Sequence, residues 1–357
     1  MKHRQLHRII AKRKKNAIIQ SMQSSEFQKL TEKFLGKLSE TIIGQEELCR
    51  SILMAYIAGG HVLLEGAPGL AKTLTVKTFA EYTGLAFKRI QFTPDLLPAD
   101  IIGTLIFQQG RGEFTVRKGP LFANIILADE INRAPAKVQS ALLEAMAERQ
   151  VTIGETSYEL PEPFFVLATQ NPIEQDGTYP LPEAELDRFM MKLFVPYPSQ
   201  ADEVKIVQSI AAQALTAEQK NGKNAKVDTV LLKPEELCAL RAFCTEITID
   251  ESVTNYIVAL VSATRRTERV MNERDIFKGS YLSYISVGAS PRAGIALQVL
   301  SKIEAAFSGR SYVIPDDIKK LAYPVMRHRI KLSYEAIAEN ISPDNIIEEI
   351  LSLVPQP

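Results

Sequence analysis

The sequence predicts an α/β fold with a parallel sheet, followed by a helical region, and two observations support this prediction. Up to about residue 198, continuous apolar runs typical of buried strands alternate with helical patterns. Strands without polar alternation indicate a parallel sheet that is covered by helices on both faces. Beyond residue 198, helical periodicity dominates. We therefore expect a basic extension and helix at 1–40, an α/β core at 41–198 and a helical domain at 199–357.

The expected elements of the core follow from local patterns. Apolar runs predict strands at 62–64, 125–128 and 164–169, and an imperfect alternation predicts a further strand at 87–92. Helical spacing of apolar residues predicts helices at 27–38, from 46 to 57, at 74–82 and at 138–146. In the second domain, helical patterns run through Val204 and Val207, from Val253 to Val261, and from Ile295 to Ile303. The polar segment 219–224 predicts a flexible surface loop there.

Two β-hairpins are expected as inserts in the core. The first pairs Leu105 and Phe107 with Phe114 and Val116 across residues 109–112. The second pairs Val151 and Ile153 with Tyr158 and Leu160 across residues 154–155. Neither hairpin is needed to complete the sheet, so both are either projections toward a partner or a central pore, or plain surface decoration.

Length and composition are those of a globular chain of two domains. It has 357 residues, of which 46% are hydrophobic and 24% charged. We find neither an apolar run long enough to span a bilayer nor a secretory signal pattern, and expect a cytoplasmic protein without a transmembrane segment. The three cysteines, Cys49, Cys238 and Cys244, form no CxxC pair, which argues against a disulfide framework or a zinc site. We expect them to be small buried hydrophobic residues.

The net charge of zero conceals an asymmetry. Residues 1–15 hold seven basic residues and no acid, which leaves the rest of the chain with an excess of seven acids. A basic tail can bind nucleic acid or an anionic membrane surface, but this one contains no aromatic residue for base stacking. We favour a solvated extension, and the acidic body makes nucleic acid an unlikely partner.

A loop that can hold phosphate follows the first predicted strand. Residues 65–73 read EGAPGLAKT, in which successive backbone N–H groups can surround a phosphate while Lys72 reaches its outer oxygens and Thr73 holds Mg²⁺. The strict pattern has glycine before the lysine, where this chain has Ala71, and we expect its methyl group to require a helix-like φ. The alternative is a Gly/Pro turn between a strand and a helix.

Two further polar sites follow buried strands. Asp129 and Glu130 end the run at 125–128, where Asp129 would bind Mg²⁺ through water and Glu130 would polarise the attacking water. Asn171 follows the run at 164–169 and could position that water, although an Asn before proline is also a common turn residue. Since the carboxyl ends of parallel strands form one ligand-binding edge, we expect these sites to converge. Arg188 is either functional or part of a surface ion pair with Asp187 or Glu183.

Taken together, the motifs resemble those of the MoxR family of AAA+ ATPases, from about residue 43 onward. The similarity lies in GAPGLAKT at 66–73, LADEINRAP at 127–135, ATQNP at 168–172, LDRF at 186–189 and GASPRA at 288–293. Alanine before the lysine is usual in that family. The resemblance implies an AAA+ core with two hairpin inserts and an all-α lid, and a Mg²⁺-dependent ATPase whose nucleotide sites lie between the subunits of a ring, with a hexamer expected.

The resemblance also assigns the site residues. It implies Lys72, Glu130, Asn171 and Arg188 as catalytic, the last two as sensor 1 and the arginine finger, and Thr73 and Asp129 as ligands of Mg²⁺. The predicted nucleotide-binding residues are Gln45, Gly66, Ala67, Pro68, Gly69, Leu70, Ala71, Lys72, Thr73 and, as sensor 2, Arg292.

The family resemblance suggests a chaperone-like role toward partner proteins, often ones with a von Willebrand factor A domain. Three alternatives stay open at this point. They are the ATPase subunit of a metal chelatase, a nucleic-acid motor or loader, and a scaffold that binds ATP without useful turnover.

Overall fold

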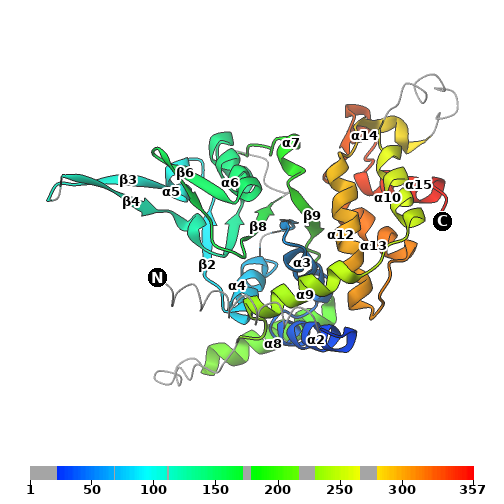
Figure 1. Cartoon of the computed structure of the whole chain (residues 1–357), viewed down its shortest axis with the longest axis horizontal. Helices are drawn as coiled ribbons and strands as arrows, with labels where there is room; N and C mark the ends of the chain where they lie inside the picture. The colour runs from blue at the N-terminus through cyan, green and yellow to red at the C-terminus, as the bar shows by residue number, and fades with distance from the viewer. Residues whose placement is uncertain (1–21, 68, 111, 172–177, 217–229, 266–279) are drawn as a thin grey trace, which may run out of the picture.

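A five-stranded parallel sheet forms the centre of the molecule (Figure 1). The computed structural model describes residues 22–67, 69–110, 112–171, 178–216, 230–265 and 280–357. The strand order is β2-β5-β8-β1-β9. The strands are β1 His61–Glu65, β2 Phe87–Gln91, β5 Ile125–Asp129, β8 Phe165–Gln170 and β9 Phe189–Phe194. The predicted parallel sheet is confirmed, and β9 is a strand that the sequence patterns did not reveal.

Both faces of the sheet are buried, because side chains alternate between two hydrophobic clusters. Val62 and Leu64 of β1 pack into a cluster with α2, α3 and α4, whereas Leu63 packs on the other face against α6. In β5, Ile125 and Ile126 divide between the two faces in the same way. The first cluster continues into the helical domain, so one hydrophobic core joins the two regions. The limits of the domains at 40 and 198 stay a prediction.

Helices of the α/β region surround this sheet. They are α2 Ser24–Thr41, α3 Glu46–Ala58, α4 Lys72–Thr83, α5 Pro98–Ile102, α6 Ala136–Glu148 and α7 Glu183–Leu186, with short 3₁₀ turns at η1 Pro120–Phe122 and η2 Ile131–Arg133. Gly59 and Gly84 end α3 and α4 in the left-handed conformation, at φ 73° and 65°. Glycine adopts this conformation without the strain that a side chain would add.

Two antiparallel hairpins are inserted, as predicted. The pairs Leu105–Val116 and Phe107–Phe114 join β3 Gly103–Gln108 to β4 Glu113–Lys118, and this hairpin projects far from the body (Figure 1). Its Phe114 is 67% exposed. The second hairpin joins β6 Gln150–Ile153 to β7 Thr156–Glu159. Val151 pairs with Tyr158 as predicted, and Leu160 lies one residue beyond β7, where its N–H donates to the Arg149 oxygen at 2.9 Å.

The C-terminal region is helical, with one short ribbon. Its elements are α8 Gln200–Thr216, α9 Pro234–Glu246, α10 Glu251–Ala263, η4 Tyr281–Tyr284, α12 Pro291–Phe307, α13 Pro315–Met326, α14 Tyr334–Ala338 and α15 Pro343–Leu353, and β10 Ile285–Val287 pairs with β11 Lys331–Leu332. The predicted basic tail and the loop at 219–224 lie outside the described residues. Within the described ranges, we find no helix with the length and apolarity that a bilayer crossing requires.

Side chains after α13 attach this lid region to β9. Arg329 donates to the backbone oxygens of Phe189 at 2.6 Å and Met190 at 3.2 Å, and its side chain is only 3% exposed. The buried ring of His328 hydrogen-bonds the Phe189 oxygen through Nε2 at 2.9 Å. These contacts fix the start of the lid's last helices against the edge strand of the sheet.

Candidate nucleotide-binding site

The phosphate-loop candidate connects β1 to α4, as the sequence predicts. Gly66 lies against β9, and a Cβ there would stand 2.8 Å from Val195 Cβ and 2.9 Å from the Val195 oxygen. No side chain fits in that space, which explains why glycine is needed at this position. The Lys72 amine donates to the Gly66 oxygen at 2.7 Å, so the lysine folds over the loop that it follows. Pro68 lies outside the described residues.

Ala71 corrects one expectation about this loop. Its φ is 55°, in the left-handed region, and not the helix-like value that we expected for a residue with a methyl group. Left-handed backbone costs a non-glycine residue about 1–2 kcal/mol, which explains why the strict form of the motif has glycine here. Gly69, at φ 84°, is also left-handed. Such alternation turns successive N–H groups toward one concave side, the arrangement that binds anions.

Lys72 lies within electrostatic reach of three carboxylates. Burial lowers the pKa of the half-buried Lys72 amine, and the charges of Asp129, Glu130 and Glu65 oppose that shift. The loop and the predicted acids are therefore close enough to interact.

The two acids that follow β5 have different surroundings. Asp129 is buried, and its carboxylate accepts from Thr169 Oγ1 at 2.7 Å and from Arg89 Nη2 at 2.6 Å. Glu130 has φ 56°, and its backbone N–H donates to Thr169 Oγ1 at 2.8 Å. Its carboxylate accepts from Gln91 Nε2 at 2.8 Å and lies 3.2 Å from Arg133 Nε. The Thr169 hydroxyl therefore links both acids to β8.

Thr169, Arg89 and Gln91 are residues that the sequence analysis missed. A polar residue within the apolar run of β8 is a signal that could have drawn attention to Thr169. Arg89 and Gln91 gave no such signal, because their relation to the acids depends on the pairing of β2 with β5, in which Gln91 lies beside Asp129.

Asn171 is buried directly after β8. This strand lies between β1, which leads into the phosphate loop, and β5, which ends at Asp129. The loop is also attached to β8, because the Gly66 N–H donates to the Gln170 oxygen at 3.4 Å. The structure thus brings the three predicted sites to one edge of the sheet. The individual roles of these residues stay predictions.

Gln45 offers a buried acceptor beside the same edge. Its Nε2 donates to the Pro196 oxygen at 2.9 Å, and the preceding Val195 N–H donates to the Glu65 oxygen at 2.8 Å. Within the described part of the chain, the buried Gln45 Oε1 has no hydrogen-bond partner. A ligand with an N–H donor, such as the amino group of adenine, would satisfy it. This atom and the phosphate loop both fit a nucleotide.

Arg188 and Arg292 are related to Asp187 differently. Arg188 is its neighbour in the chain, whereas Arg292 contacts its carboxylate from the lid. Arg188 is half-buried after α7, and its backbone N–H donates to the Glu185 oxygen at 3.1 Å. The acid next to it pairs with lid residues, with Arg329 at 2.7 Å and with Arg292 at 3.6 Å. Asp187 thus has other partners than the surface pair considered for Arg188.

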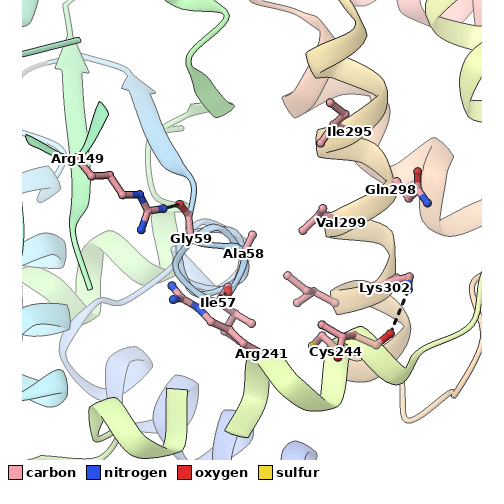
Figure 2. A pocket seen from close by; sticks show the side chains of 12 residues that line it. Ile57, Ala58, Gly59, Arg149, Arg241, Cys244, Ile295, Gln298, Val299 and Lys302 are labelled. Atoms are coloured by element: carbon pink, nitrogen blue, oxygen red, sulfur yellow. Dashed lines mark hydrogen bonds between the residues drawn. The ribbon is translucent and has the colours of Figure 1, made fainter. Parts of the chain in front are cut away.

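Two pockets lie in different parts of the fold. One, of about 500 Å³, lies between the site and the lid, where Gln170, Asp187 and Lys192 face Ser290 and Arg327. The other, of about 540 Å³, lies among α3, α9 and α12 and contains none of the predicted site residues (Figure 2). There Arg149 and Arg241 bind carbonyls at the end of α3. The first pocket also contains none of the predicted site residues, but its lining residues Gln170 and Asp187 directly precede Asn171 and Arg188 in the chain.

Comparisons with known proteins agree with this geometry. The model of the ATPase family associated with various cellular activities (AAA) matches residues 61–191, and the AAA lid domain matches 283–350. A solved structure from Cytophaga hutchinsonii, of a protein classed as an ATPase, has a TM-score of 0.80 and 46% identity, covering 93% of this chain and 96% of that one. Fold and site together define an AAA+ ATPase, a class of nucleotide-binding proteins.

Full-length relatives narrow the class to one family. The chain is 44% identical to Chaperone MoxR1 of Mycobacterium tuberculosis, over 91% of this chain and 82% of the relative. It is 42% identical to the uncharacterized protein YeaC of Bacillus subtilis, over 90% of this chain and 95% of the relative. It is 30% identical to Protein MoxR of Methylorubrum extorquens, over 91% of this chain and 94% of the relative. The chain belongs to the MoxR family of AAA+ ATPases.

Proposed function

We propose that this chain hydrolyses ATP to ADP and phosphate with Mg²⁺, and uses that reaction in the cytoplasm to remodel or activate partner proteins. One observation supports the reaction most strongly. The phosphate loop, the Asp129–Glu130 pair and Asn171 follow three neighbouring parallel strands and meet at one edge. The residues needed to bind a triphosphate and to activate water therefore occupy one site.

The proposed roles follow from the surroundings of each side chain. Loop N–H groups and Lys72 would bind the phosphates, and Thr73 and the buried Asp129 would hold the metal. Mg²⁺ would neutralise charge on the β- and γ-phosphates when bound. Glu130 orients and polarises the water that attacks the γ-phosphate, after its carboxylate leaves Gln91 and Arg133. Asn171 positions the same water.

Arg188 and Arg292 complete the proposed mechanism. Arg188 acts on the nucleotide of a neighbouring subunit, and Arg292 reaches the γ-phosphate from the lid. This division requires a ring with ATP at each interface, and we expect a hexamer. Mass photometry of the Glu130→Gln variant with ATP tests this assembly, since a monomer at all protein concentrations would contradict it.

Turnover of ATP is tested by replacing the proposed base. Removal of a general base lowers rates by about 10²–10⁴-fold, so Glu130→Gln should lose at least about 10²-fold in phosphate release while it still binds ATP. Glu148→Gln is the matched control, because Glu148 is an exposed glutamate at the end of α6. A Glu130→Gln variant with the rate of the unmodified protein would exclude Glu130 as the base.

The client is proposed from the family. A relative named as a chaperone supports a remodelling role, and we expect a protein with a von Willebrand factor A domain as partner. The Glu130→Gln variant should retain such a partner on an affinity column in ATP and release it in ADP. Recovery of nucleic acid alone would contradict the chaperone role and favour a nucleic-acid motor.

A further inference from the structure

The Asp187 carboxylate contacts three side chains from the lid. Its Oδ1 accepts from Arg329 Nε at 2.7 Å, and its Oδ2 accepts from the Ser290 hydroxyl at 2.6 Å. Arg292 Nη1 lies 3.6 Å from the same Oδ2. Ser290 is also the N-cap of α12 and accepts from the Arg292 N–H at 3.1 Å. One acid of the core thus determines where the first turn of α12 lies.

The two arginines on Asp187 differ in how firmly they are held. The Arg329 side chain is 3% exposed and also binds backbone oxygens of β9, so its removal would leave buried groups unpaired. The Arg292 side chain is 57% exposed, and its contact is longer. Exposed ion pairs contribute little, so Arg292 can leave Asp187 at low cost. Asp187 therefore has one permanent and one exchangeable partner.

One partner of the exchangeable contact, Asp187, lines a pocket whose other walls are attached to the phosphate loop. Asp187 and Ser290 line the same pocket as Gln170 and Lys192. Gln170 accepts from the Gly66 N–H at 3.4 Å, and Lys192 Nζ lies 2.6 Å from the Glu65 carboxylate, directly before Gly66. Two walls of the pocket are therefore attached to the loop that is proposed to bind phosphate. An anion there would compete with Asp187 for the Arg292 guanidinium.

We propose that Asp187 determines discrimination between ATP and ADP, because it holds Arg292 until a γ-phosphate attracts that guanidinium away. The inference rests on the proposed function, since it needs a nucleotide in this site. ADP lacks the third phosphate and leaves the Arg292–Asp187 contact in place, whereas ATP must break it. Asp187 also precedes Arg188 in the chain. Exchange of Arg292 thus changes the surroundings of the residue that is proposed to act on the neighbouring subunit.

The test compares dissociation constants of ATPγS and ADP, measured by calorimetry with Mg²⁺. Asp187→Asn removes the charge that competes for Arg292, so binding of ATPγS should tighten while that of ADP stays unchanged. An exposed ion pair of this kind allows a change of the ADP/ATPγS ratio of up to about fivefold. In an Arg292→Gln background, the Asp187→Asn change should leave the ratio unaltered.

Asp344→Asn is the matched control. Asp344 also pairs with a lid arginine, Arg327, at 2.8 Å, but has no contact with Arg292 among the described residues. Its ratio of dissociation constants should equal that of the unmodified protein. If Asp187 had a purely structural role, Asp187→Asn would weaken the binding of ATPγS and ADP equally, and that result would overturn the inference.

A second variant covers the case in which Asp187→Asn does not fold. Ser290→Gly removes the hydroxyl that shares Oδ2 with Arg292, and glycine at an N-cap costs only a few tenths of a kcal/mol. Arg292 should then bind Asp187 more tightly, and the ratio should change in the opposite direction. An unchanged ratio would overturn the inference. Failure of the unmodified protein to bind either nucleotide would instead contradict the proposed function.

Discussion

The two edges of the central sheet use polar side chains in different ways. At the carboxyl edge, the two acids bind other side chains, while Lys72 and Gln45 donate to backbone oxygens. Asp129 pairs with Arg89 and Thr169, and Glu130 pairs with Gln91 and Arg133. The exposed partners Arg89 and Gln91 can be replaced by a ligand without loss of a backbone hydrogen bond in a strand. The edge that is proposed to bind nucleotide is thus one where contacts can exchange.

At the amino edge, side chains bind the backbone. Arg241 donates to the oxygens of Ile57 and Tyr56, and Arg149 donates to the Gly59 oxygen, beyond the end of α3 (Figure 2). His61 accepts from the Val166 N–H at 3.0 Å and lies 3.3 Å from the Met146 oxygen. These bonds satisfy carbonyls that the fold itself fixes in place. The comparison teaches that polarity alone does not mark a reactive edge, and that the carboxyl edge differs by its two carboxylates, whose partners are other side chains.

The largest effect is expected from Arg188. Arginine fingers contribute about 10³–10⁵ in rate, so Arg188→Ala should lower steady-state turnover by at least about 10³-fold with nearly unchanged nucleotide binding. Arg149→Ala, at the amino edge, is the control and should keep its turnover. Mixing Arg188→Ala with Glu130→Gln subunits should restore part of the activity, since some interfaces then contain both residues. A mixture without activity would contradict action between subunits.

His61 gives a test of the amino edge through pH. Burial lowers the pKa of His61 to about 4, whereas the unfolded chain has a value near the ordinary 6.5. Between these values, the unfolded state binds a proton that the folded state does not, so stability falls as the pH decreases. The loss approaches about 3 kcal/mol below pH 4.

Chemical denaturation from pH 7 to 4.5 measures this dependence. His61→Gln should show a flatter profile than the unmodified protein, although the buried His328, whose pKa is also lowered, retains the same sign. Identical slopes for both proteins would contradict the proposed protonation of His61 on unfolding.

The smallest expected effect concerns Thr169 at the carboxyl edge. Thr169→Val leaves the Glu130 N–H and one oxygen of Asp129 without the hydroxyl, which should lower the free energy of unfolding by about 1–3 kcal/mol. Thr169→Ser keeps the hydroxyl and is the control. Both are compared by urea denaturation at pH 7. Equal midpoints would show that the link between the acids contributes no stability.

Much of the fold was accessible from local patterns, and the exceptions have physical causes. The phosphate loop and the strand before Asp129 were found because their residues are neighbours in the chain. β9 was missed because its partly exposed positions include Met190 and Lys192, and the charge of Lys192 pairs with Glu65 of another strand. Helical periodicity predicted helices through Val207 and Ile295, and both residues lie in helices, although their side chains are 64% and 63% exposed. Apolar residues at the surface are common, so periodicity indicates a helix more reliably than burial.

By itself, the sequence determined most of the element types, β9 excepted, and the residue chemistry of the proposed site, because hydrophobic periodicity and short motifs act between residues close in the chain. Only the tertiary structure decided that Ala71 is left-handed, that Arg89 and Thr169 bind Asp129, and that Asp187 joins Arg329 and Arg292. These contacts join residues up to 142 positions apart. Their geometry depends on how the sheet and the lid pack, which no local pattern records.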